Sequence, residues 1–223
     1  MKRVFRTLLI CILSVVAFCI QAQEKEQLVL IDTNMGKIKV KLFNDTPLHR
    51  DNFIKNVQEK RYDGTLFHRV VKHFMIQGGD FSSVGATAET ALGKDSLDYS
   101  VPAEIIYPKY FHKKGMLCAA RPSDDENPEK VSSPAQFYIS TGKFYTAMEL
   151  DKMEAEKEIK FTPEQRDAYM REGGVPHLDG EYTIFGEVVS GIKIVDKIQY
   201  VEKTTADRPV KDIIVKSMTL VDK

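Results

Sequence analysis

Cysteine is scarce in this chain of 223 residues, which contains only three. Cys11 and Cys19 fall within the first twenty residues, so Cys118 is the only thiol in the rest of the sequence. Because one thiol cannot form an internal disulfide, the sequence excludes a small scaffold held together by disulfide bonds. A small, buried apolar residue is the simplest interpretation of Cys118.

An excess of positive charge is also missing. The chain has 32 basic and 32 acidic residues, and removing the three basic residues of its first six positions leaves 29 against 32. No basic patch and no glycine run that could hold phosphates is present, which argues against a nucleic-acid partner. The histidines stand apart from any cysteine or carboxylate pattern, so we predict no metal site, and no hydrolase motif stands out.

Only one long apolar run exists, and it lies at the N-terminus. Residues 8–20 are apolar apart from Ser14, follow a basic start and precede Ala22 and a polar segment. This layout is typical of a secretory signal peptide, predicted here over residues 1–22, and the run is short for a membrane span. We therefore expect export and no stable membrane span after cleavage.

Two other fates of this leader remain open. An uncleaved leader would anchor the protein in a membrane. Lipid attachment at Cys19 is the second alternative, although Phe18 stands where the signals of bacterial lipoproteins have a small residue.

The remainder, residues 27–223, suits one domain with an insertion. Period-two alternation and β-rich composition predict strands over eight segments: 27–31, 38–43, 66–71, 74–77, 115–119, 136–140, 182–189 and 213–221. Apolar residues at helical spacing predict helices at 47–58 and 191–198, the first with Thr46 as its N-cap. Many short strands with two separate helices favour a closed, mostly antiparallel barrel, because closure removes exposed sheet edges.

Residues 141–175 have a different, helical character. Thr146 and Thr162 each stand three residues before a Glu or Gln, the spacing of a capping box. We therefore expect helices at about 147–159 and 163–172, with a Gly-Gly pair ending the second. This hairpin is either a solvated, charged surface element or a wall beside a functional groove.

The most informative stretch is residues 67–81, Phe-His-Arg-Val-Val-Lys-His-Phe-Met-Ile-Gln-Gly-Gly-Asp-Phe. It combines a cation, an apolar pair, an amide and a Gly-Gly turn. It resembles the signature of the cyclophilin-type peptidyl-prolyl cis-trans isomerases, in which Phe-His-Arg precedes Phe-Met-x-Gln-Gly-Gly-Asp. The resemblance covers residues 28–140 and 176–221. It implies a mostly β fold, a closed eight-stranded antiparallel barrel capped by two helices, here with an inserted helical hairpin.

Three further segments also resemble family motifs: 115–121, 135–139 and 177–186. Carried over residue by residue, the resemblance implies Arg69 as the catalytic donor. It implies the following substrate contacts: His68, Phe74, Met75, Gln77, Ala120, Arg121, Gln136, Tyr138, Leu178 and Tyr182.

Four positions depart from the family's pattern. Ala119 replaces a methionine and Arg121 replaces an asparagine, so the contact expected at Arg121 does not carry over directly. Tyr138 stands in place of a phenylalanine, and its hydroxyl needs a partner. His177 replaces the tryptophan associated with tight cyclosporin binding, so weak cyclosporin binding is expected.

The implied reaction breaks no bond. Amide resonance opposes rotation about an X-Pro bond with a barrier of about 18–20 kcal/mol, so the catalyst must bind the twisted amide better than the planar forms. No nucleophile, metal or cofactor is needed. Arg69 can hold a permanent positive charge near the imide nitrogen. Phe74, Met75 and Tyr138 offer an apolar slot for the ring. Gln77 and Gln136 suit the flanking peptide of a proline-containing polypeptide.

The sequence therefore predicts an exported isomerase that assists protein folding, with the periplasm preferred to an extracellular location. A module on the same barrel that binds proline-containing chains without turnover, or acts as a chaperone, is one alternative. Another is an assembly protein that acts through the insertion, which the heavy charge of 147–172 argues against. The joint presence of Arg69, Phe74 and Gln77 favours the enzyme.

Overall fold

The computed structural model describes residues 25–94 and 97–222. The expected signal peptide and Cys19 lie outside the described residues. Eight strands form one sheet in the order β3-β4-β6-β5-β7-β2-β1-β8, and every neighbouring pair is antiparallel. The strands are β1 (Leu28–Thr33), β2 (Gly36–Leu42), β3 (Arg69–Val71), β4 (Met75–Gly78), β5 (Met116–Ala119), β6 (Phe137–Ser140), β7 (Ile184–Ser190) and β8 (Val215–Val221).

The sheet is an open half-barrel, so the expectation of a closed barrel was wrong. β3 and β8 stand at the two ends of the strand order, and no ladder joins them within the described residues. The segments that precede them meet at one isolated bridge, between Leu66 and Ile214. The physical reason is the short length of β3: the strand expected over 66–71 is regular only in its last three residues, which pair with β4.

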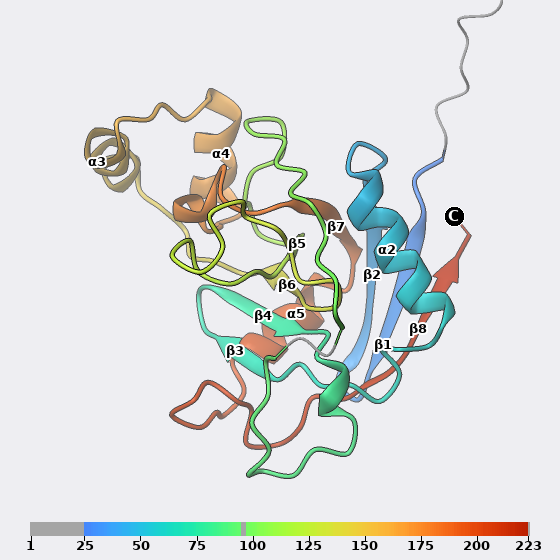
Figure 1. Cartoon of the computed structure of the whole chain (residues 1–223). Coiled ribbons are helices and arrows are strands. Elements are labelled where there is room, and N and C mark those ends of the chain that lie inside the picture. Colours follow the sequence, from blue (N-terminus) through green and yellow to red (C-terminus); the bar gives the residue numbers. More distant parts are fainter. Residues whose placement is uncertain (1–24, 95–96, 223) are drawn as a thin grey trace, which may run out of the picture.

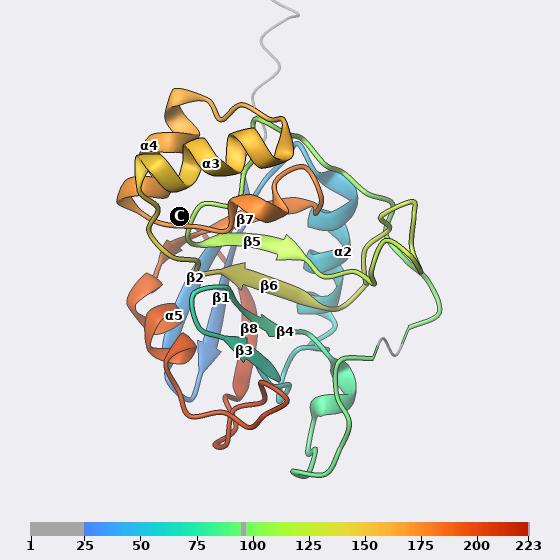
Figure 2. The same cartoon turned by 90° about the vertical axis from the view of Figure 1, so that its left-hand side faces the viewer.

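Two predicted helices pack on this sheet, α2 (Pro47–Gln58) against β8 and α5 (Ile192–Gln199) against β2, β3 and β4. They lie on opposite sides of the strands (Figure 2). Because successive side chains of a strand point to opposite faces, one set enters the main core. There Phe137 of β6 is buried together with Phe53 of α2 and Val195 of α5. None of the described helices is long and apolar enough to span a membrane.

A distant carboxylate, rather than Thr46, holds the N-terminus of α2. The Thr46 hydroxyl donates to the carbonyl oxygen of Phe43, 3.4 Å away, and makes no cap bond. Glu104 accepts from the backbone N–H groups of Leu48 and His49 at 3.0 and 2.9 Å. Its Oε2 also lies 2.6 Å from Nδ1 of His49. Because a carboxylate interacts favourably with the positive N-terminal end of a helix dipole, this contact ties the loop around Glu104 to α2.

Mild acidification is expected to destabilise the fold. Burial lowers the pKa of His49 and of His68 below the ordinary value of 6.5, although Glu104 opposes the shift at His49. The unfolded chain therefore binds protons more readily at these positions, so the free energy of unfolding falls as the pH drops below about 6.5. Thermal unfolding followed by circular dichroism at about pH 7.5 and about pH 5.5 measures this change above the range in which carboxylates protonate.

The His68→Gln variant is expected to lose part of that pH dependence, because it removes one of the two imidazoles cited above, whose pKa is lowered by burial. An unfolding temperature that stays constant across the interval would contradict the assignment.

The insertion forms the predicted hairpin, α3 (Ala147–Lys157) followed by α4 (Pro163–Arg171). Both capping boxes are present as predicted: the side chains of Thr146 and Thr162 accept from backbone N–H groups three residues on, and the side chains found there bond back. Two short 3₁₀ helices complete the described fold, η2 (Phe81–Ser83) and η3 (Pro176–Leu178).

The hairpin has its own small core instead of standing free in solvent. The buried residues of this core are Phe111, Leu150, Phe161, Ala168 and Tyr169. Of these, Phe111 lies outside the insertion. In both views the two helices lie together beyond β5 (Figure 1 and Figure 2). Most of the charged residues that suggested a solvated element are exposed, but Glu154 is buried and accepts from the backbone N–H of Phe161 at 2.9 Å.

Candidate functional site

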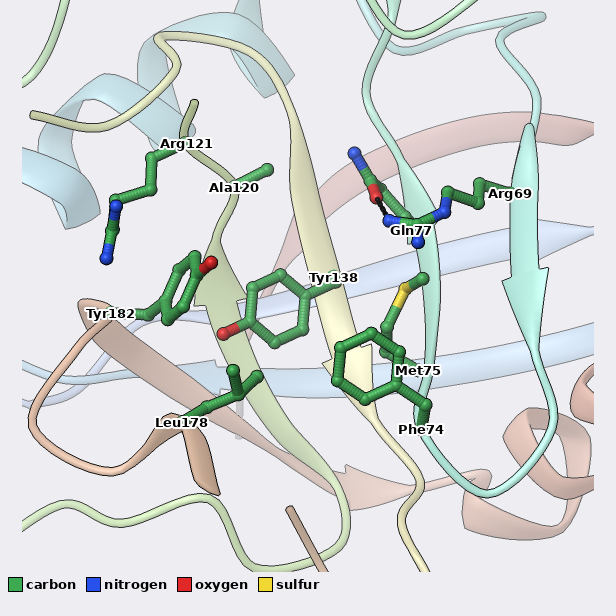
Figure 3. A pocket seen from close by; sticks show the side chains of 9 residues that line it. All are labelled: Arg69, Phe74, Met75, Gln77, Ala120, Arg121, Tyr138, Leu178 and Tyr182. Atoms are coloured by element: carbon green, nitrogen blue, oxygen red, sulfur yellow. Dashed lines mark hydrogen bonds between the residues drawn. The ribbon is translucent and has the colours of Figure 1, made fainter. Parts of the chain in front are cut away.

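Nine of the eleven predicted site residues line one pocket, which Figure 3 shows. They are Arg69, Phe74, Met75, Gln77, Ala120, Arg121, Tyr138, Leu178 and Tyr182. The cavity measures about 130 Å³, well below the roughly 300–1,000 Å³ of sites for drug-sized ligands. Its size suits one small ring rather than a whole cofactor.

Strand alternation explains why these side chains meet. Met75 and Gln77 lie two residues apart on β4 and face the pocket, whereas Ile76 between them points into the main core. On β6 the side chain of Tyr138 lines the pocket while Phe137 is buried in that core. The two strands are neighbours in the sheet, so their outer faces form a continuous wall.

A chain of hydrogen bonds runs along the polar side of the pocket. Arg69 Nη1 donates to Gln77 Oε1 in a long bond of 3.4 Å, and Gln77 Nε2 donates to Gln136 Oε1 at 3.1 Å. Gln136 Nε2 in turn donates to the carbonyl oxygen of Gly93 at 3.1 Å. Because both ends of each amide are engaged, the orientations of the two amides are set, and the guanidinium of Arg69 stands at the end of the chain.

Arg69 is exposed at the pocket rim and carries no paired anion. Within residues 25–94 and 97–222, no carboxylate oxygen lies within 4.0 Å of its guanidinium. The opposite arginine differs: the Arg121 side chain is 3% exposed, pairs with Asp124 at 2.5 Å and lies 4.3 Å from the centre of the Tyr182 ring. Arg121 is thus a fixed wall, and Arg69 is the pocket cation that can donate to a ligand.

The apolar floor of the pocket is rigidly packed. Met75 and Tyr138 are buried, and Phe74 and Leu178 pack against the same cluster. The ring of His177 stacks on Phe74 with centres 5.6 Å apart and an interplanar angle of 22°. A small neutral ring fits this floor without leaving a polar group unpaired.

The hydroxyl of Tyr138 has a hydrogen-bond partner, as the sequence predicted without identifying the residue. Its oxygen lies 3.0 Å from Nε2 of His112, whose Nδ1 lies 3.1 Å from Oδ1 of Asp179. Burial raises the pKa of Tyr138 well above its ordinary value, so the hydroxyl stays neutral and offers no phenolate nucleophile. Sequence reasoning did not assign His112 or Asp179 to the site. The added hydroxyl at Tyr138 signalled that a partner was needed, and Asp179 lies in the segment 177–186 that resembles a family motif.

Two predicted site residues lie in hollows beside the pocket. Gln136 lines a hollow that shares Gln77, Ala120 and Arg121 with the pocket. His68 lines another on the far side of Arg69, where it is buried and burial lowers its pKa. The structure therefore places His68 behind the catalytic candidate rather than in the ring slot. In the described part of the chain, no group of three His, Cys, Asp or Glu residues could hold a metal ion.

A family model and curated proteins resemble this chain. The model described as "Cyclophilin type peptidyl-prolyl cis-trans isomerase/CLD" matches residues 28–220. A protein of Staphylococcus haemolyticus named as a peptidyl-prolyl cis-trans isomerase is 29% identical over 205 residues, covering 91% of this chain and 96% of that protein. A Streptococcus pyogenes protein named as a bifunctional phosphatase and peptidyl-prolyl cis-trans isomerase is 32% identical over 197 residues, 87% of this chain but 38% of that protein.

Solved structures show the same fold. A cyclophilin-type peptidyl-prolyl cis-trans isomerase of Cryptosporidium parvum superposes with a TM-score of 0.64 at 25% identity, covering 89% of this chain and 99% of that one. A second structure of that protein, determined in the presence of the dipeptide Ala-Pro, gives a TM-score of 0.63 at 26% identity, covering 88% and 100%.

Proposed function

This chain belongs to the cyclophilin-type peptidyl-prolyl cis-trans isomerases, and on that premise we propose that it isomerises X-Pro bonds in exported proteins and so assists their folding. The enzyme class and its proline-containing peptide substrates follow from the family, whose model spans nearly the whole described chain.

The single observation that carries the assignment of residues is the unpaired guanidinium of Arg69 at the rim of an apolar slot. As the X-Pro amide twists, resonance is lost and the imide nitrogen regains its lone pair, to which a permanently cationic N–H group can donate. Each tenfold gain in rate requires about 1.4 kcal/mol of preference for the twisted form. Phe74, Met75 and Tyr138 would hold the ring while the peptide on one side turns.

The groups that can bond the backbone of the flanking peptide lie on the polar side of the site. The ordered amides of Gln77 and Gln136 lie along it, and Ala120 stands at the end of β5 beside the same hollow. The peptide must be positioned on both sides of the X-Pro bond, because rotation is catalysed only if one side is held while the other turns.

Export rests on the leader, since a basic start, a short apolar run and Ala22 have the layout of a signal peptide. Fractionation of a bacterial host that expresses the full chain tests this, with mass spectrometry of the mature N-terminus. We expect a processed protein outside the cytoplasm, preferably in the periplasm. A Cys19→Ser variant with unchanged processing would exclude lipid attachment, and a full-length cytoplasmic product would overturn the proposal.

Assistance in folding is tested with a protein whose slow refolding phase is X-Pro isomerisation. Catalytic amounts of the mature enzyme are expected to accelerate that phase. If it speeds exchange in a short X-Pro peptide but leaves the refolding phase unchanged, the folding role fails while the isomerase stands.

Cyclosporin binding is expected to be weak, because His177 stands at the pocket edge where the family pattern has a tryptophan. The His177→Trp variant should bind cyclosporin at least about tenfold more tightly, as expected for a large aromatic anchor in a binding site. Isothermal titration of both proteins measures the difference. The matched change Tyr200→Trp, at an exposed position, should leave the affinity unchanged. Tight binding by the parent protein would contradict this expectation.

A further inference from the structure

A buried chain of hydrogen bonds connects the pocket floor to the inserted hairpin. It begins at the hydroxyl of Tyr138, passes through the ring of His112 at 3.0 Å and reaches Oδ1 of Asp179 at 3.1 Å. It ends on α4, where the hydroxyl of Tyr169 lies 2.5 Å from Oδ2 of Asp179. None of the nine pocket-lining residues belongs to 141–175, and this chain is one of the contacts through which the hairpin reaches the residues around the pocket.

The donor directions in this chain are set by chemistry. The Asp179 carboxylate only accepts, so Tyr169 O–H, the backbone N–H of His112 at 2.7 Å and His112 Nδ1–H all donate to it. A ring that carries its one hydrogen on Nδ1 accepts at Nε2, where the Tyr138 hydroxyl can donate to it. Every group in the chain is thereby used, and the Tyr138 hydroxyl has one preferred orientation.

Burial makes this arrangement rigid. The side chain of Asp179 is 3% exposed and that of His112 is 0% exposed. Tyr169 is fully buried inside the hairpin core with Phe111 and Phe161, against which its ring packs edge-on. The rings of His112 and Tyr138 are nearly parallel, with an interplanar angle of 7°. A hydrogen-bond network in such a low-dielectric setting responds strongly to the loss of one member.

We propose that Tyr169 is a positioning residue for the isomerase site, through which the inserted hairpin fixes the Tyr138 ring that floors the proline pocket. Tyr169 donates to Asp179, Asp179 holds the tautomer and orientation of His112, and His112 holds the Tyr138 hydroxyl. A second link points to the same role: Lys157 Nζ, at the end of α3, donates to the carbonyl oxygen of His177 at 3.1 Å. The inference rests on the proposed function of the pocket.

The experiment is a double-mutant cycle on kcat and KM for an X-Pro peptide, using Tyr169→Phe, Tyr138→Phe and the combined variant. Tyr169→Phe is expected to lower kcat/KM about fivefold, within the range of couplings inside one hydrogen-bond network. The loss should fall on KM, because the floor contacts the ring in both the planar and the twisted forms. In the Tyr138→Phe background, Tyr169→Phe should have no further effect, since the chain no longer reaches the pocket.

Tyr145→Phe is the matched control, because Tyr145 packs on Tyr169 in the same insertion and its hydroxyl has no hydrogen-bond partner among the described residues. It should leave kcat and KM unchanged. Circular dichroism gives the folded fraction of each variant, and a mere loss of folded protein would lower kcat without moving KM. If Tyr169→Phe does not fold, Asp179→Asn replaces it in the same cycle with the same expectation.

Equal effects of Tyr169→Phe in both backgrounds, or none in the parent, would overturn the positioning role. A parent protein that is folded yet inactive would instead overturn the proposed function. The Arg69→Ala variant assayed alongside separates the two cases, because its loss of activity does not depend on the hairpin.

Discussion

Replacing Arg69 by alanine is expected to lower kcat/KM for cis-to-trans exchange in a short X-Pro peptide by about 100-fold or more, the scale seen when one donor to a transition state is removed. The guanidinium stands at the rim of the ring slot with no carboxylate within 4.0 Å in the described residues, so its charge is available to the twisting amide. Because the side chain is exposed, its loss should leave the unfolding temperature unchanged.

Two further variants define the role of Arg69. Arg69→Lys keeps the charge but loses the planar fork, so its kcat/KM should fall between those of the parent and of Arg69→Ala. Arg171→Ala is the matched control, because the Arg171 side chain is 78% exposed on α4 and, among the described residues, forms an ion pair only with Asp167. Its activity should equal that of the parent. An Arg69→Ala enzyme that keeps a third or more of the parent's activity would remove Arg69 from the mechanism.

Local patterns predicted most of the elements. Alternation of apolar and charged residues marks β2, and the apolar spacing around Phe53 and Val57 marks α2. The two capping boxes place the start of α3 and of α4 at the observed residue, because cap bonds join groups only three residues apart. The pocket likewise follows from short motifs, since neighbouring strands bring Gln77 and Tyr138 opposite each other.

Contacts between distant parts of the chain were not predictable in this way. Glu104 caps α2 across 56 residues, and nothing local to Thr46 shows that its own hydroxyl turns elsewhere. The link from His112 to Asp179 spans 67 residues. The open sheet has the same origin: closure depends on how far the segment before β3 pairs with the segment before β8, and no pattern within either segment sets that length.

Phe137→Ala is expected to lower the free energy of unfolding by about 4 kcal/mol, the cost of removing a large aromatic side chain from a packed core. Phe137 is 1% exposed, and its ring meets the rings of Phe53, Tyr62 and Phe67 edge-on with centres 5.5, 5.7 and 5.9 Å apart. Urea unfolding followed by circular dichroism measures the change. Phe144→Ala is the matched control, because Phe144 is 63% exposed and should change the stability little.

The same variant separates the two faces of β6. Phe137 points into the main core, whereas its neighbour Tyr138 faces the pocket, so the substitution removes packing without removing a pocket group. At a temperature where both proteins are folded, kcat/KM per folded molecule should therefore stay within about threefold of the parent. That pattern is the reverse of Arg69→Ala, which should lose activity and keep its stability. A Phe137→Ala enzyme as stable as the parent would mean that the core around β6 closes over the missing ring.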